Sequence, residues 1–172
     1  DAKTIRYGLG AIKGTGEAAL SVILRVRHEN GPFRDLFDFC RRIDKRVVNR
    51  RVIEALIRAG AFDAIDDHRA KLLASAGVAL EAADVPRWSE REQLMNEKPA
   101  LGFFFSGHPY HAYAAELASF VKRRLGQLEP QREPVLLAGV VMSTRTQMTR
   151  RGKMAVVVLD DGTTQLEVTV FS

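Results

Sequence analysis

Lys13-Gly14-Thr15-Gly16-Glu17 is the stretch that decides how this chain is interpreted. It joins the apolar run over 5–12 to a helical pattern that begins at Glu17. A Gly-x-Gly between two short helices allows a tight reversal of the chain, and it leaves backbone N–H groups pointing outward at the start of the second helix. The stretch therefore predicts an αα-hairpin whose corner suits a phosphate.

The helix after this corner is amphipathic. A solvent stripe of Glu17, Ser21, Arg25 and His28 recurs at helical spacing, and the residues expected to face inward are Ala19, Leu20, Ile23, Leu24 and Val26. No strand precedes the glycines and no third glycine follows them, so the corner is not a dinucleotide-binding turn.

A second hairpin follows a short connecting helix over 34–42. A helix over 49–59 is expected to end at Gly60 in a left-handed conformation, and Asp66 or Asp67 is expected to cap the next helix. This hairpin lacks a second glycine, so the sequence predicts phosphate binding less strongly here than at the first hairpin. Phe62 is expected in the core between the two hairpins. Residues 1–83 are therefore predicted to form a tandem helix-hairpin-helix DNA-binding domain.

Charge supports a polyanionic partner for this domain. The formal net charge of the chain is +5, and residues 1–75 hold 15 Lys and Arg against 10 Asp and Glu. The densest basic stretch lies between the two hairpins and consists of Arg41, Arg42, Lys45, Arg46, Arg50 and Arg51. These side chains are either the solvated faces of two helices or an edge that tracks phosphates.

Residues 84–130 are predicted to form a helical linker. Ser89 and Glu92 have the spacing of a capping box at a helix start, and a further helix is expected over 112–125. The three aromatic residues at 103–105 cannot all face one side of a helix, so we expect them to be wedged between two elements. His108 and His111 lack a cysteine or carboxylate partner, and no metal site is predicted.

From residue 135 the hydrophobic period changes from helix to strand. Strands are expected over 135–149, 154–159 and 165–171, with turns at 150–153 and 160–162. This three-stranded antiparallel meander resembles the opening half of an oligonucleotide-binding (OB) fold, which has five strands. Residues 131–172 are thus predicted to be an incomplete OB-fold. The fold class is mainly α followed by β.

Catalytic chemistry is not expected in this stretch. The acid pairs Asp66-Asp67 and Asp160-Asp161 sit at a helix start and at a turn, where capping and turn formation account for them. Cys40, the single cysteine, excludes a disulfide within the chain and fits a reducing compartment. No apolar run could span a bilayer and no signal peptide opens the sequence, so a cytoplasmic location is expected. The chain, which begins at Asp1, is expected to be a piece of a longer protein.

Several ordered strings resemble the C-terminal region of the C family of bacterial replicative DNA polymerases, the DNA polymerase III alpha subunits. They span nearly the whole chain and are Ile5-Arg6-Tyr7-Gly8-Leu9-Gly10-Ala11-Ile12-Lys13-Gly14-Thr15-Gly16, Phe33-Arg34-Asp35-Leu36-Phe37-Asp38-Phe39-Cys40, Ala55-Leu56-Ile57-Arg58-Ala59-Gly60-Ala61-Phe62-Asp63, Leu101-Gly102-Phe103 with Ser106-Gly107-His108-Pro109, and Thr149-Arg150-Arg151-Gly152-Lys153-Met154-Ala155.

The resemblance implies a DNA-directed DNA polymerase as the parent protein, with Mg²⁺ at catalytic aspartates that precede this segment. It implies that Gly14, Thr15 and Gly16 contact duplex phosphates with the support of Lys13. Arg150, Arg151 and Lys153, in the turn after the first strand, are a candidate single-strand contact. Replisome subunits are implied as partners, but 84–96 offers Gln93-Leu94-Met95 without the aromatic residue of the family's clamp-binding motif. Either a loop has been trimmed here or the clamp contact lies elsewhere, so clamp binding is not expected from this string.

Three other readings of the sequence stay open. The segment could be a scaffold that docks replisome proteins, a stand-alone repair protein with the same hairpins, or part of a translesion paralogue of the same polymerase family.

Overall fold

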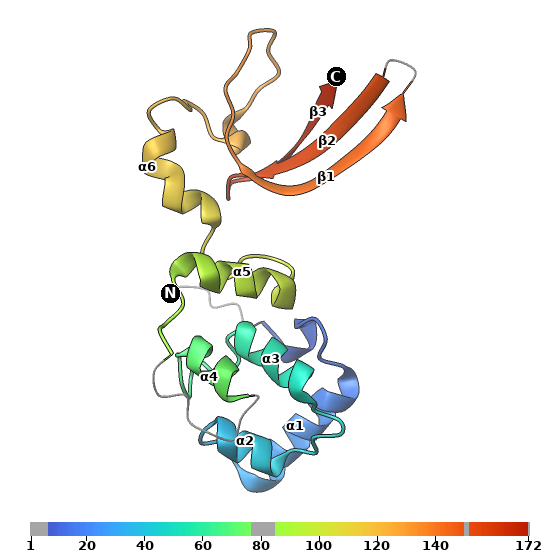
Figure 1. Cartoon of the computed structure of the whole chain (residues 1–172), viewed down its shortest axis with the longest axis vertical. Helices are drawn as coiled ribbons and strands as arrows, with labels where there is room; N and C mark the ends of the chain where they lie inside the picture. Colours follow the sequence, from blue (N-terminus) through green and yellow to red (C-terminus); the bar gives the residue numbers. More distant parts are fainter. Residues whose placement is uncertain (1–6, 77–84, 150–151, 172) are drawn as a thin grey trace. The chain divides into compact units, whose positions relative to one another are not determined.

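A computed structural model describes residues 7–76, 85–149 and 152–171. The chain divides into two compact units, one ending at Ser106 and the other beginning at Gly107. The first is helical and the second carries a three-stranded antiparallel sheet (Figure 1), so the fold class is confirmed. The segment expected to be a linker over 84–130 is shared between the units, because its first helix belongs to the helical unit.

Among its described residues, the helical unit contains a 3₁₀ turn and five α-helices. The turn is η1 (Leu9–Ala11), and the helices are α1 (Glu17–Asn30), α2 (Leu36–Arg42), α3 (Arg50–Arg58), α4 (Arg69–Ser75) and α5 (Glu90–Leu101). Side chains cap most of these helices: Asp35 accepts from the amide of Asp38 at 2.6 Å, Asn49 accepts from Val52 at 3.2 Å, and Ser89 forms the expected capping box with Glu92.

One hydrophobic core joins these elements. Phe39 of α2 and Phe62 of the second hairpin meet edge to face with centroids 5.1 Å apart, which confirms the core position of Phe62. The buried cluster consists of Ile12, Ala19, Ile23, Leu36, Phe39, Ile43, Val48, Val52, Ile53, Leu56, Ile57, Phe62, Leu72 and Leu101. The two hairpins therefore share one core, to which α5 contributes Leu101.

Two local expectations about the helices were wrong. Leu24 is exposed because the core covers only the face of α1 that bears Ile23 and Val26. His68, and not Asp66 or Asp67, is the N-cap of α4: its side chain accepts from the amide of Lys71 at 3.2 Å, while Asp66 accepts from the amide of His68.

The second unit begins with short helical turns, η2 (Pro109–Tyr113), α6 (Ala114–Leu117) and η3 (Leu125–Gln127). A continuous helix over 112–125 was expected, and this prediction was wrong. Tyr113 and Phe120, which would have formed its apolar face, are about half exposed, so no packing surface stabilises a longer helix there.

The sheet has the order β1-β2-β3, with β1 (Val140–Thr149), β2 (Gly152–Asp160) and β3 (Gln165–Phe171). β1 begins five residues later than the expected strand start at 135, and its register shifts at a bulge between Val141 and Ser143. At Gly139, a Cβ would stand 3.1 Å from Leu159 and 3.2 Å from the backbone of Asp160. Glycine therefore permits the close approach that leads the chain into the sheet.

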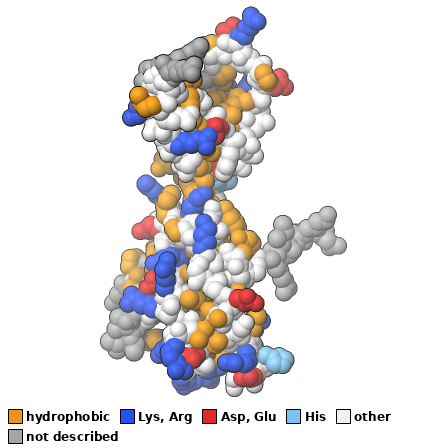
Figure 2. All heavy atoms as spheres, turned by 90° about the vertical axis from the view of Figure 1, so that its right-hand side faces the viewer, with side chains coloured by type: hydrophobic (Ala, Val, Ile, Leu, Met, Phe, Trp, Pro, Cys, Tyr) orange, Lys and Arg blue, Asp and Glu red, His pale blue; other side chains and the backbone are white. Residues whose placement is uncertain are grey.

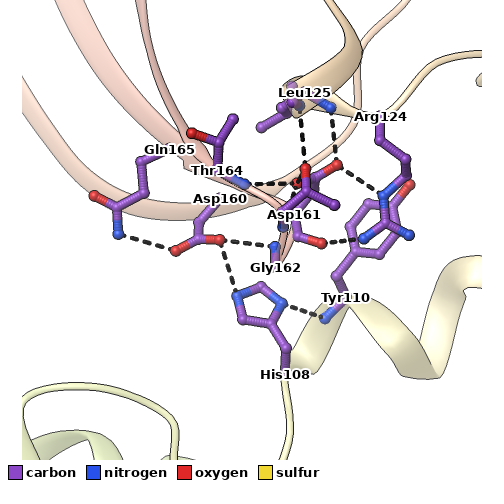
Figure 3. A network of polar contacts seen from close by, with 11 residues as sticks. His108, Tyr110, Arg124, Leu125, Asp160, Asp161, Gly162, Thr164 and Gln165 are labelled. Carbon is purple, nitrogen blue, oxygen red and sulfur yellow. Dashed lines mark hydrogen bonds and ion pairs between the residues drawn. The ribbon is translucent and has the colours of Figure 1, made fainter.

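Asp161 anchors the sheet to the segment before it (Figure 3). Its fully buried carboxylate accepts from the Leu125 amide at 2.9 Å, from Arg124 Nε at 2.8 Å and from the Thr163 hydroxyl at 2.6 Å. Burial alone would raise the pKa of this carboxyl, but the hydrogen bonds outweigh burial and hold the pKa well below its usual range. Asp160 has the simpler turn role that was expected, accepting from the Gly162 amide at 2.8 Å.

In the described ranges, no helix is both long enough and apolar enough to pass through a membrane.

Candidate nucleic-acid interface

The corner over 14–16 is built as the sequence predicts. Gly14 has a φ of +89°, a conformation that favours glycine, and Gly16 is the N-cap of α1. No described atom lies within 4 Å of the position that a Cβ would take at either glycine. The backbone of both residues is exposed at the N-terminus of a 14-residue helix, where N–H groups and the helix dipole favour an anion.

Thr15 has a different role from the one expected. Its side chain is buried, its hydroxyl donates to the carbonyl of Ile12 at 2.6 Å and lies 3.0 Å from that of Leu9, and its amide also donates to Ile12 at 3.2 Å. These polar groups hold the corner together from inside. The open positions of the corner are therefore Gly14 and Gly16.

Lys13 connects the corner to α5. Its amide donates to the carbonyl of Ala100 at 2.7 Å, and its Nζ stands 3.0 Å from where a Cβ would be on Gly102, the residue that ends α5. The ammonium group lies at the negative end of the α5 dipole and remains exposed. The cation expected to support the corner is thus positioned by a helix that was expected to belong to a linker.

The basic stretch supplies exposed charge near α3. Within the described part of the chain, Lys45 and Arg51 have no carboxylate partner, whereas Arg46 pairs with Asp44 and Arg50 with Glu54 at the surface. Arg50 and Arg51 occupy the first turn of α3, which contains no acid. Positive side chains at the N-terminus of α3 add to the positive end of the helix dipole, so the start of α3 favours an anion.

Arg42 does not belong to this surface. Its guanidinium is engaged within the protein. It donates to the carbonyls of Val26, Gly31 and Pro32 at 3.2, 2.8 and 3.1 Å, and it lies 4.5 Å from the ring centre of Phe33. It supplies donors to carbonyls at and just after the carboxyl end of α1, where helix carbonyls lack backbone partners within the helix. The assignment of Arg42 to a DNA contact is corrected to a structural role.

Sequence reasoning missed Arg25. Its charge helps to lower the pKa of Asp44, after the larger effects of the hydrogen bonds from Arg46, so Arg25 lies near the loop between α2 and α3. Its place in the solvent stripe of α1 was the available signal. On the face shown in Figure 2, Lys and Arg side chains over the helical unit lie among hydrophobic ones and do not form one continuous patch.

The corner of the second hairpin is closed. A Cβ on Gly60 would stand 2.8 Å from both Arg69 Cζ and Asp63 Oδ2, because the Arg69 side chain lies across this turn. Arg69 Nε donates to Asp63 at 2.8 Å, and Arg69 also reaches Glu97 of α5 at 2.9 Å. This ion network fills the place that a phosphate would need, which explains why the two hairpins differ.

Arg150 and Arg151 lie outside the described residues. Lys153 belongs to β2, where it pairs in register with Met148, and not to a turn. A single-strand contact at these three residues stays a prediction.

The described residues contain no group of three His, Cys, Asp or Glu side chains placed to hold a metal ion. Gln93-Leu94-Met95 lies inside α5, with Leu94 buried and Gln93 donating to Ser106 at 2.8 Å, so this string is not presented as an extended peptide.

Comparisons with known proteins agree with this geometry. Residues 1–72 match the family model described as "Helix-hairpin-helix motif". The chain is 44% identical over 192 residues to the DNA polymerase III subunit alpha of Neisseria meningitidis serogroup A. This alignment covers 96% of the chain and 17% of that protein. The chain is homologous to a segment of the bacterial DNA polymerase III alpha subunit. The resemblance found in the sequence is confirmed.

Two further relatives have the same name. The Vibrio cholerae protein is 37% identical over 205 residues, covering all of the chain and 18% of the relative, and the Escherichia coli K12 protein is 36% identical over 202 residues, covering 98% and 17%. The chain thus spans less than a fifth of the length of these alpha subunits. The Vibrio alignment is longer than the 172 residues of the chain, so that alpha subunit has residues without a counterpart here.

Proposed function

We propose that the helical unit is a DNA-gripping segment of a replicative polymerase, which binds duplex DNA through its phosphates without sequence preference. The observation that carries this proposal is the open corner at Gly14 and Gly16, set at the N-terminus of α1 and flanked by Lys13. Lys45, Arg51 and Arg25 supply further positive charge on the same unit. Homology to DNA polymerase III alpha subunits supports the DNA context.

The test is duplex binding by fluorescence anisotropy from low to physiological salt. Each neutralised phosphate releases counterion, so affinity should fall steeply as salt rises. Two glycines allow a matched comparison, since neither Gly16 nor Gly8 has a described atom within 4 Å of its Cβ position and neither has a positive φ. Gly16→Ala should weaken binding about tenfold by placing a methyl group against the phosphate, and Gly8→Ala should not.

Charge variants extend this test. Lys45→Gln and Arg51→Gln should each reduce the salt slope by about one, while Arg91→Gln, an exposed cation on α5, serves as the control. A flat salt slope, or equal affinities of the Gly16→Ala and Gly8→Ala variants, would contradict the proposal.

For the parent protein we propose DNA-directed DNA polymerase activity in the bacterial cytoplasm, with Mg²⁺ bound by residues outside this segment. The names of the relatives support the activity, and the segment itself is proposed to be inactive alone. Primer extension by the 172-residue chain alone should give no product, whereas the full-length parent protein should extend the primer.

A docking role for the sheet unit is a second proposed function. Among the described residues, β1 and β3 each pair with β2 alone, and the sheet exposes apolar side chains, among them Met148 at 80% and Phe171 at 65%. An uncovered edge and apolar face favour contact with another protein surface. Retention on columns of replisome subunits at high salt, where phosphate contacts fail, would support this role, and complete elution would contradict it.

A further inference from the structure

An exposed aromatic cluster lies on the helical unit and has no part in the duplex contacts proposed above. Tyr7 and Phe103 meet edge to face with ring centres 5.3 Å apart, and Phe103 and Phe105 are 6.4 Å apart. All three rings are between 38% and 56% exposed. We propose that this cluster stacks an unpaired nucleotide of a DNA strand that continues beyond the duplex held at the corner; the inference rests on the proposed duplex binding.

The cluster adjoins the corner. Phe103 directly follows Gly102, and Lys13 Nζ stands 3.0 Å from the Cβ position of that glycine. The ammonium group of Lys13 therefore lies close to the residue that precedes Phe103 in the chain. The rings and the cation of the corner therefore belong to one neighbourhood of the helical unit.

The backbone beneath the rings is rigidly held. Glu97 accepts from the amides of Phe105 and Ser106 at 2.9 and 2.8 Å and from the Ser106 hydroxyl. Gly102 ends α5 with a φ of +93°. A segment that is fixed while its rings face outward keeps a stacking surface ready, so little conformational entropy is lost when a base binds.

The surrounding charge suits a nucleotide. Lys98 Nζ lies 4.9 Å from the ring centre of Phe104, and Lys13 Nζ stands 3.0 Å from the Cβ position of Gly102. The carboxylate of Glu97 behind the segment is fully buried and paired with Arg69 at 2.9 Å, so it does not repel a phosphate. Rings with neighbouring cations are the pattern that binds single-stranded nucleic acid by stacking.

The test compares a blunt duplex with the same duplex carrying a short overhang of thymidines, using the complete 172-residue chain and anisotropy at low salt. The wild-type chain should bind the overhang duplex more tightly. Phe105→Ala and Phe105→Leu should lose about fivefold in affinity for the overhang duplex and nothing for the blunt one, because a stacked base is worth about that factor or more. Phe105→Trp should keep the preference.

Phe120→Ala is the matched control, since Phe120 is a similarly exposed phenylalanine in the sheet unit. Unchanged overhang affinity in the two Phe105 variants would overturn the inference, and so would an equal loss for both DNAs. Analytical sedimentation tests whether a second copy of the chain covers the cluster instead. If Phe105→Leu abolishes self-association of the chain and leaves DNA binding unaltered, the cluster is an interface between copies. In each of these outcomes, blunt-duplex binding with a steep salt slope leaves the proposed function intact.

Discussion

Arg41 and Arg42 are neighbours on α2, yet their side chains are 73% and 16% exposed. Arg41 makes one contact of 3.4 Å to Asp38, whereas Arg42 pairs with Asp38 at 3.0 Å and also donates to three carbonyls at and after the end of α1. The pair shows how position on a helix decides whether a charge is available to a ligand. Because both residues lie in the same short helix, they form a matched pair for comparing an exposed cation with a structural one.

Arg42→Gln should lower the free energy of unfolding by about 2 kcal/mol, since several carbonyls and the face of Phe33 lose their partner. Arg41→Gln should change it by less than about 0.5 kcal/mol. Urea denaturation measures both. For DNA affinity the order should reverse, with Arg41→Gln the weaker binder; the same loss of DNA affinity in both variants would contradict the structural role of Arg42.

Glu17 opposes the proposed phosphate contact. It is exposed at the first position of α1, where a carboxylate stabilises the helix but repels an anion at the same N–H groups. Glu17→Gln should therefore raise duplex affinity severalfold at low salt and lower helix stability by a few tenths of a kcal/mol. Anisotropy measures the first effect, and Glu29→Gln, at the far end of α1, is the control. A weaker duplex complex would argue against an anion at this corner.

At the scale of elements, α5 holds the two hairpins in place. Its Ala100 carbonyl accepts from Lys13 of the first hairpin, its Asn96 accepts from Arg58 at 3.2 Å, and its Glu97 pairs with Arg69 of the second hairpin. Figure 1 shows α5 beside α3. The corner that is open and the one that is closed are both set by contacts to this helix.

Glu97→Gln should destabilise the helical unit by about 3 kcal/mol, because it leaves the buried guanidinium of Arg69 with one carboxylate instead of two. Glu90→Gln, an exposed change on the same helix, should stay within about 0.5 kcal/mol. Denaturant unfolding followed by Trp88 fluorescence reports on both variants. Equal midpoints would show that the buried pair does not hold α5.

His108 caps the η2 turn, with Nδ1 accepting from the Tyr110 amide at 3.3 Å and Nε2 lying 3.2 Å from Asp160 (Figure 3). Burial lowers the pKa of His108, and His111 and Arg124 add to this, while Asp160 and Asp161 oppose it. A proton on Nδ1 would also face the Tyr110 N–H. The neutral form is therefore the form that the fold favours.

A lowered pKa in the folded state means that stability is present above the unfolded value of about 6.5 and is lost as the pH falls below it. Unfolding of the sheet unit, followed by amide signals of β2, should become easier as the pH falls below about 6.5. His108→Asn, which keeps a capping oxygen, should flatten this dependence, and His28→Gln should not. An unchanged slope in His108→Asn would assign the effect elsewhere.

At the scale of the whole molecule, the two units bury very different cores. The helical unit contains a continuous apolar cluster, whereas the buried apolar side chains among the described residues of the other unit are Tyr110, Leu125 and Val156. Since apolar burial is the main favourable contribution to folding, the sheet unit should be the less stable one.

Hydrogen exchange tests this difference directly. Amides of α3 should exchange only on global unfolding of the helical unit, and those of β2 should exchange at least about tenfold faster through opening of the thinly covered sheet. Comparable protection of α3 and β2 would mean that the sheet has cover beyond its own side chains.

Local patterns were enough to predict much of this protein. The capping box at Ser89, the left-handed conformation of Gly60, and the period change before the sheet depend on neighbours a few residues apart. The same is true of the ordered strings that revealed its homology to a polymerase subunit, since such strings are properties of the sequence alone.

Only the tertiary structure decided which of these features are open to a ligand. Thr15 was assigned to DNA from the family resemblance and Arg42 from the dense basic stretch, but the Thr15 side chain is buried inside its own corner and Arg42 holds carbonyls at and after the end of α1. Gly60 was covered by Arg69, and α5 became part of the helical unit through Glu97, 28 positions away from Arg69. Apart from Thr15, whose partners are three and six positions away, these outcomes depend on contacts between residues far apart in the chain, and a local pattern carries no information about such contacts.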